Sequence, residues 1–270
     1  MKFIFVAACL TILFFALPVS AGEQNEAQML SASADMPIFN SPLKNAEKLR
    51  RDSQGSSRGF HRSLMTRRSG ELTRGLTRSQ KGQADKKTPG KPPSMVPLVP
   101  ETSGFTSKSQ PVLMWYASGP WPDKMEFRVN AFRSEEPLLD TGIDGPVSEG
   151  VFHVSLADYG VSLKADVEYE WFLTIVFDED DRSADYFISG TIVYREPFPN
   201  TARDLENAPE DHLYFAYAKA GYWYDALAHL SQGIHARPHD SELRRHRAKL
   251  LEQVNLPTAA AYDIGQIPEK

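Results

Sequence analysis

The spacing of apolar and polar residues predicts a series of short strands in the middle of the chain. Residues 124–132 alternate strictly, with Met125, Phe127 and Val129 on one side and polar residues on the other, which is typical of a half-buried strand. Comparable apolar or alternating runs predict further strands at 111–117, 150–156, 167–177 and 185–195. Because Gly, Pro, Asp and Asn separate these runs, the pattern favours an antiparallel β-sandwich over residues 95–200.

Two details refine the predicted sandwich. The run at 167–177 begins by alternating and becomes apolar on both sides, as a central strand does, and it carries Tyr169 and Trp171. This stretch resembles the strand of immunoglobulin-like sandwiches from which a Tyr and a Trp enter the core. In the last strand, Gly190 predicts either a bulge or a close approach of another segment to the backbone.

After the strands the apolar period changes to that of helices, over residues 201–257. Asn207 and Glu210 have the spacing of a capping box, which predicts a helix that ends at Gly221. A second helix is expected over 223–237, and Asp240 is expected to cap a third over 241–256. The last two resemble a tetratricopeptide repeat hairpin, but one hairpin is too few for a repeat array, so we expect it to pack on the sandwich. Residues 258–270 are expected to form a tail.

The first 21 residues have the pattern of a secretory signal peptide. Lys2 precedes a short apolar run, and Val19-Ser20-Ala21 fits a small-x-small cleavage site, so the mature chain would begin at Gly22 and contain no transmembrane span. An uncleaved anchor and a lipoprotein-like box that ends at Cys9 are the alternatives. Since Cys9 is the only cysteine, disulfides, thiol nucleophiles and cysteine-based zinc sites are not expected in the mature chain.

The net charge of −5 conceals a division between a basic segment and an acidic body. Residues 44–91 hold 14 Lys and Arg against 4 Asp and Glu, whereas residues 101–270 hold 15 against 28. Residues 22–94 have few large apolar residues, so we expect a disordered basic arm. Such an arm is either a solvated linker or a contact for anionic polymers and lipid headgroups. Nucleic acid is not expected as its partner, because only Phe60 and His61 could stack on bases.

The candidate site with the most charge is the stretch that follows the strand at 167–177. Four aspartates (Asp178, Asp180, Asp181 and Asp185) are its candidate metal ligands, although the spacing and the turn glycine of an EF-hand are missing. Arg182 could instead pair with Asp181 or Asp185 and lock a hairpin turn. The same segment, with Arg182, could also be a protein contact.

Three other groups have the residue types of functional sites. Glu168 and Glu170, about 7 Å apart on one strand face, have the spacing of an inverting glycosidase pair, but no glycosidase motif surrounds them. His229, His235 and His239 are near a helix end, but Pro238 breaks the helical spacing between the last two. Tyr222, Trp223 and Tyr224 are expected to pack in the core, and would be interaction candidates if they were exposed.

Three segments in the same order resemble a known family: "PLVPETSGFTSKSQPVLMWY", "YEWFLTIVFDEDDRSADYFISGTI" and "YAKAGYWYDALAHL". They are similar to domain-of-unknown-function family 928, a group of secreted bacterial proteins, over about residues 96–256. The resemblance implies export and the same two-part body, and it carries no activity. The chain departs from the family pattern where Val176 and Phe177 stand in place of a cysteine.

We therefore expect an exported protein, periplasmic or extracellular, that is not an enzyme and needs no cofactor. Its expected role is that of an interaction or accessory module with a protein partner in the cell envelope. Two alternatives are a periplasmic ligand- or metal-sensing domain that works with a membrane protein, and an envelope glycan hydrolase. Chelator sensitivity would favour the first alternative, and turnover lost in Glu170→Gln the second.

Overall fold

The computed structural model describes residues 36–42, 93–178 and 180–268. The signal peptide predicted at 1–21 and most of the basic arm predicted at 22–94 lie outside these residues. The chain divides into two units, and the second, which begins at Pro37, contains all the strands and helices considered below. Among the described residues, no helix has both the length and the apolar content that crossing a membrane requires.

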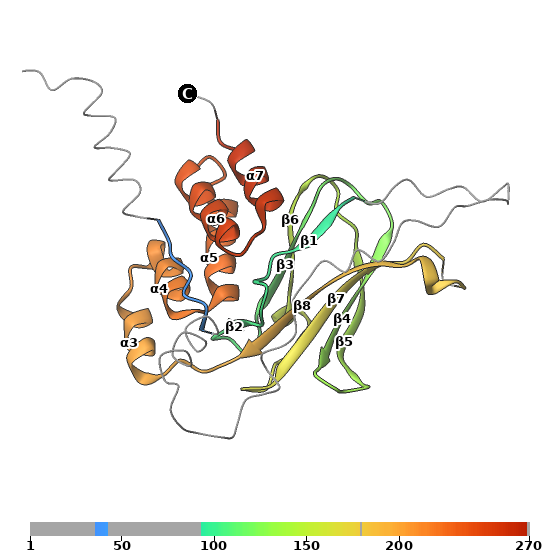
Figure 1. The fold of residues 1–270 in the computed structure, drawn as a ribbon, viewed down its shortest axis with the longest axis horizontal. Coiled ribbons are helices and arrows are strands. Elements are labelled where there is room, and N and C mark those ends of the chain that lie inside the picture. The colour runs from blue at the N-terminus through green and yellow to red at the C-terminus, as the bar shows by residue number, and fades with distance from the viewer. Residues whose placement is uncertain (1–35, 43–92, 179, 269–270) are drawn as a thin grey trace, which may run out of the picture. The chain divides into compact units, whose positions relative to one another are not determined.

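Eight strands form two sheets in the described residues (Figure 1). The three-stranded sheet has the order β1-β3-β6, and the five-stranded sheet has the order β2-β8-β7-β4-β5. All neighbouring strands are antiparallel except β2 and β8, which are parallel. The strands are β1 (Met95–Pro97), β2 (Gly104–Thr106), β3 (Val112–Ala117), β4 (Lys124–Ala131), β5 (Pro137–Asp144), β6 (Gly150–Ser155), β7 (Glu168–Ile175) and β8 (Tyr186–Tyr194).

The five strands predicted from apolar patterning correspond to β3, β4, β6, β7 and β8. The other three strands were not predicted. β1 and β2 are only three residues long, too short for a period to be visible. β5 lies at the edge of its sheet with mostly exposed side chains, and its sequence PLLDTGID mixes apolar residues with two aspartates and a glycine.

Five α-helices follow the strands in the described chain (Figure 1). They are α3 (Pro199–Asn207), α4 (Leu213–Ala220), α5 (Trp223–Ala236), α6 (Ser241–Gln253) and α7 (Pro257–Gly265). Three short 3₁₀ segments are η1 (Leu156–Tyr159), η2 (Arg182–Ala184) and η3 (Glu210–His212). The predicted helices at 210–221, 223–237 and 241–256 correspond to η3 with α4, to α5 and to α6.

The predicted ends of these helices are partly confirmed. Gly221, in the left-handed conformation, ends α4, and the Asp240 carboxylate accepts hydrogen bonds from the Glu242 and Leu243 N–H groups at the start of α6. The capping box was wrong, because Asn207 is the last residue of α3 rather than the cap of the next helix. The tail expected from residue 258 was also wrong, since Pro257–Gly265 form α7.

One buried cluster joins both sheets to the helices. It contains Leu113 from the three-stranded sheet, Phe127 and Trp171 from the five-stranded sheet, and Trp223 and Leu250 from the helices. Burial of such large side chains contributes about 1.5–3 kcal/mol each to folding. The strands and helices therefore stabilise one another through a common core.

Part of the predicted arm also belongs to this unit. Pro37 and Ser41 are buried, and the backbone of Asn40 donates a hydrogen bond to the carbonyl oxygen of Ala218 in α4. The prediction of disorder across 22–94 is therefore wrong for residues 37–42. The segment PIFNSP is too short and too rich in proline for its two large apolar residues to make a period.

Candidate functional site

The candidate site is the segment between β7 and β8, residues 176–185, which we call the acidic turn; Glu179 within it lies outside the described residues. Two of its aspartates fold the backbone locally. The Asp178 carboxylate accepts a hydrogen bond from the Asp180 N–H at 3.0 Å, and Asp181 accepts one from the Ser183 N–H at 3.1 Å at the start of η2. Aspartate favours such turns because its short side chain can replace a backbone acceptor.

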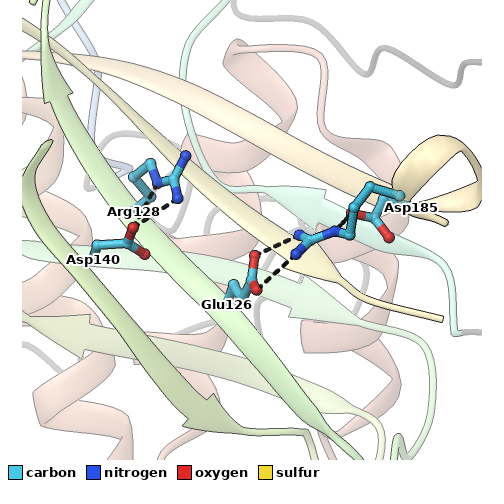
Figure 2. A network of polar contacts seen from close by, with 5 residues as sticks. Glu126, Arg128, Asp140 and Asp185 are labelled. Carbon is cyan, nitrogen blue, oxygen red and sulfur yellow. Dashed lines mark hydrogen bonds and ion pairs between the residues drawn. The ribbon is translucent and has the colours of Figure 1, made fainter. Parts of the chain in front are cut away.

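Arg182 then joins the acidic turn to strand β4 (Figure 2). Its Nε donates to Asp185 Oδ2 at 2.6 Å, which confirms the predicted turn lock. Its two terminal nitrogens donate to both oxygens of Glu126, at 3.1 and 2.6 Å. The planar guanidinium thus contacts two carboxylates with three donors, a geometry that lysine cannot reproduce.

The charges of the acidic turn stabilise one another. Hydrogen bonds from the Ser183 side chain and backbone hold the pKa of the Asp181 carboxyl below its usual value. Hydrogen bonds to Glu126 and Asp185 raise the pKa of the Arg182 guanidinium. The charged forms of Asp181 and Arg182 are therefore stabilised. The Arg182 and Glu126 side chains are nearly half exposed.

A second ion pair lies beside the first on the same sheet (Figure 2). Arg128 on β4 donates from Nε and Nη2 to Asp140 Oδ2 on β5, at 3.1 and 2.6 Å. The two residues are directly opposite each other in the antiparallel ladder. Glu126 and Arg128 are two positions apart on β4, so both ion pairs occupy one face of the five-stranded sheet.

The structure does not bring the four aspartates together as a metal site. Within the described ranges, no three His, Cys, Asp or Glu side chains are arranged to hold a metal ion. Asp181 and Asp178 accept backbone hydrogen bonds, and Asp185 pairs with Arg182. The observed contacts are those of a braced turn.

The glutamate pair occupies two different environments. Glu168 is buried and hydrogen-bonded to the Ser103 hydroxyl, whereas Glu170 is partly buried with the Ser189 hydroxyl at 3.4 Å. The two glutamates, which share one strand face in the sequence pattern, therefore differ in their exposure to solvent. Its carboxylate is buried because β2 and the loop before it, which carries Ser103, run beside β8.

The predicted histidine cluster is not formed by the three residues named. His235 and His239 are exposed, while His229 is partly buried beside Tyr214. His246, which was not predicted, is a buried residue of α6. Its Nδ1 lies 2.6 Å from the Tyr214 hydroxyl. Burial lowers the pKa of both His229 and His246, so each is held neutral inside the helical part.

Tyr222, Trp223 and Tyr224 are buried, with exposed fractions of 5%, 0% and 2%. Trp223 donates from Nε1 to the Leu98 carbonyl at 2.9 Å, and the Tyr224 hydroxyl donates to the Thr191 carbonyl at 2.9 Å. These contacts fasten α5 to the strands. The three residues therefore have the core role expected of them, and their burial removes them as candidates for an exposed binding surface.

The family described as Domain of Unknown Function (DUF928) matches residues 70–264. No curated protein matches. Among solved structures, astrotactin-2, a vertebrate-specific and perforin-like membrane protein, is 14% identical with a TM-score of 0.25 over 65% of this chain and 36% of its own. A multi-domain immunophilin from Arabidopsis thaliana is 10% identical with a TM-score of 0.16 over 70% of this chain and 98% of its own.

TM-scores this low carry no conclusion about fold or function, and this chain spans only about a third of astrotactin-2. The family match is different, because it covers most of the chain, including every strand and nearly all of the helical part. It extends further in both directions than the resemblance at 96–256. The chain therefore belongs to the family of domains of unknown function designated DUF928.

Proposed function

We propose that the protein is an exported, non-enzymatic interaction module of the cell envelope. Its contact surface would consist of the acidic turn and the neighbouring outer side chains of β4 and β5. The observation that carries this proposal is the Arg182 contact with Glu126 and Asp185, which fixes an exposed charged turn to the sheet. A rigid charged surface loses little entropy when a partner binds.

The chemistry of this surface favours a protein with a basic contact face. Asp180 and Asp181 of the acidic turn are exposed and carry most of the negative charge of this surface, because the exposed Asp140 and Asp144 on the edge strand β5 face Arg128 and Lys124. Charges arranged in this way give specificity and fast association more than affinity. Phe172 and Phe187 are partly exposed neighbours on the same sheet, with ring centroids 6.3 Å apart, and would add apolar contact area.

We further propose that the two sheets are the layers of an immunoglobulin-like sandwich, and that α5 and α6 form a tetratricopeptide-like hairpin packed on it. The first part is supported by the shared core, in which Leu113 and Trp171 come from different sheets. The second is supported by the helix end at Gly221 and the cap at Asp240, which are the positions that the repeat-like pattern predicts.

Export rests on the pattern of the first 21 residues. It is tested by expressing the full chain in a bacterium with an intact export pathway and sequencing the N-terminus of the recovered protein. If the signal peptide is cleaved as proposed, the recovered chain begins at Gly22 and is found outside the cytoplasm. A full-length chain retained in the cytoplasm would contradict export while leaving the contact surface to be judged separately.

The contact surface is tested by site-specific photo-crosslinking in cells that naturally produce the protein. A photoreactive residue at Asp180 should give a discrete protein adduct, which Arg182→Ala should weaken. The matched control is the same residue at Asp158, an exposed position in η1 away from the acidic turn. Equal adducts from both positions, or none from Asp180, would contradict the proposal. Loss of the adduct after chelation would instead support the metal-sensing alternative.

A further inference from the structure

Residues Pro37–Pro42 lie against the helical part as an extended segment, far from it in sequence. Pro37 and Ser41 are buried, whereas Ile38 between them is 67% exposed. Inward and outward side chains therefore alternate, as they do in a peptide held in a groove. The segment contacts Ala218 and Lys219 at the C-terminal end of α4, Trp223 at the start of α5 and Gln253 at the end of α6, and we call these contacting residues the groove.

Gln253 recognises the backbone of this segment rather than its side chains. Its Oε1 accepts a hydrogen bond from the Phe39 N–H at 2.9 Å, and its Nε2 donates to the Pro37 carbonyl at 2.9 Å. The Gln253 amide thus pairs with one N–H and one carbonyl of the segment, as the backbone of a neighbouring strand does at the edge of a sheet. Contacts of this kind suit any extended peptide that presents the same backbone.

Asn40 satisfies the end of helix α4. Its backbone N–H donates to the Ala218 carbonyl at 3.1 Å, and its Nδ2 donates to the Lys219 carbonyl at 3.1 Å. The last carbonyl groups of a helix lack partners within the helix, so they attract such donors. Gly221 makes room for this approach, because a Cβ there would lie 2.6 Å from Pro42 Cγ and 2.8 Å from the Asn40 oxygen.

Phe39 supplies the apolar contact. Its ring lies edge-on to Trp223, with centroids 4.9 Å apart. Trp223 is completely buried and is itself hydrogen-bonded to the Leu98 carbonyl. The aromatic contact is therefore made to a fixed side chain. In the Pro-x-Phe-Asn pattern, the Pro37 carbonyl and the Phe39 N–H meet the Gln253 amide, the Phe39 ring meets Trp223, and Asn40 meets the end of α4.

We propose that this groove is a peptide-binding site and that the chain occupies it in cis with its own residues 37–42. Its ligands would be extended peptides with the Pro-x-Phe-Asn pattern. A tethered ligand competes at a high effective concentration, so the groove is closed to free peptide in the intact chain. This inference does not depend on the acidic turn.

A labelled synthetic peptide with the sequence of residues 36–42 tests the proposal. We expect no binding to the intact full chain, clear binding to Phe39→Ala, and at least tenfold weaker binding when Gln253→Ala is added. Ile38→Ala is the matched control, and it should leave the groove closed because that side chain points to solvent. Equal binding to the intact chain, to Phe39→Ala and to Ile38→Ala, or no binding to any of them, would overturn the proposal.

A second version leaves every groove residue unchanged. A specific protease site placed in the sequence between residues 43 and 92 converts the cis segment into a separate fragment after cleavage. The cleaved chain should stay folded by circular dichroism, release the fragment on dilution and bind the labelled peptide, and Gln253→Ala should again weaken that binding at least tenfold. A cleaved chain that unfolds shows that the segment is part of the fold, and a folded chain that does not bind overturns the proposal equally.

Discussion

Arg182 in the acidic turn and Glu126 on β4 form a two-point ion pair across 56 positions of sequence. β7 lies between the strand that carries Glu126 and the strand that follows the turn, so this contact fixes the turn relative to the whole sheet. The pair is exposed, and exposed ion pairs contribute little to global stability. Its effect should therefore be local.

Arg182→Ala should loosen the acidic turn without unfolding the protein. We expect faster amide exchange at Asp180 to Asp185 and a melting temperature close to that of the wild type, measured by hydrogen exchange and calorimetry. Arg182→Lys should restore the turn only partly, because an ammonium group cannot match both carboxylates in one plane. Arg128→Ala, which removes the neighbouring pair with Asp140, is the control and should leave exchange in the turn unchanged. Unchanged exchange in Arg182→Ala would contradict the bracing role.

Gly190 should tolerate no side chain. A Cβ at this position would lie 2.7 Å from Val99 Cγ1 and 2.8 Å from the Trp171 ring, which is directly opposite on β7. Gly190→Ala should therefore cost about 1–3 kcal/mol of unfolding free energy, as overpacking of a core does. Urea unfolding measures it, and Gly119→Ala, where nothing lies within 4 Å of the new Cβ, should change the value much less.

The features that were predicted from the sequence, such as the role of Gly190, and those that were not differ for physical reasons. A glycine in an apolar strand predicts either a bulge or a close approach, and at Gly190 the structure shows the close approach, to Val99 and Trp171. The apolar periods likewise predicted the longer buried strands and helices α4 to α6, whereas β1 and β2 are too short to show a period and the edge strand β5 needs none. The local Arg182–Asp185 contact follows from spacing alone. Glu126 could not be predicted as the second partner, since the order and register of β4, β7 and β8 are not visible in sequence.

The same limit explains the errors at the two ends of the body. Residues 37–42 look like part of a disordered arm because one phenylalanine and two prolines make no pattern. They are ordered by backbone contacts to Gln253 and Ala218 that only the fold brings near. In the region treated as a tail, Asp263 is completely buried, and its partner Arg247 lies on the preceding helix. A buried charge is not recognisable until its partner is known.

Asp225 should make stability depend on pH. Its carboxylate is buried in α5, accepting hydrogen bonds from the Ser107 N–H at 2.7 Å and the Thr106 hydroxyl at 3.3 Å, and burial raises its pKa to about 6. The native state then binds a proton more tightly than the unfolded state does. Stability from this residue is therefore complete below about pH 4 and declines, by about 2–3 kcal/mol, as pH rises through 6.

Asp225→Asn removes this titration while keeping an oxygen that can accept the Ser107 hydrogen bond. Relative to wild type, the variant should gain stability between pH 4 and pH 7, measured by urea unfolding at intervals across that range. Asp204→Asn, at an exposed position of α3, is the control and should give a difference that does not change with pH. If the difference in unfolding free energy between Asp225→Asn and the wild type does not change with pH, or falls as pH rises, Asp225 is not the source of the pH dependence.

Asp263 in α7 should be essential to the stability of the body. Its two carboxylate oxygens accept hydrogen bonds from Arg247 Nη2 and Nε, at 2.6 and 2.7 Å, and both side chains are buried. Asp263→Ala leaves the Arg247 charge buried without this partner, which should cost about 3–5 kcal/mol of unfolding free energy. Asp140→Ala, which removes an exposed ion pair with Arg128, should cost no more than about 1 kcal/mol.

The double variant Arg247→Met with Asp263→Leu separates the two possible reasons for such a loss. If the cost comes from the uncompensated Arg247 charge, replacing both members by apolar residues should recover much of the stability, because burying an ion pair requires desolvation that apolar side chains avoid. Arg244, 3.7 Å from Asp263, loses this carboxylate in the single and the double variant alike, so its share of the cost is not recovered. Denaturant unfolding of the single and double variants measures this directly. A double variant as unstable as Asp263→Ala would instead mean that α7 is held by the shape of its contacts, through Ala259 and Ala260, rather than by the charge of Asp263.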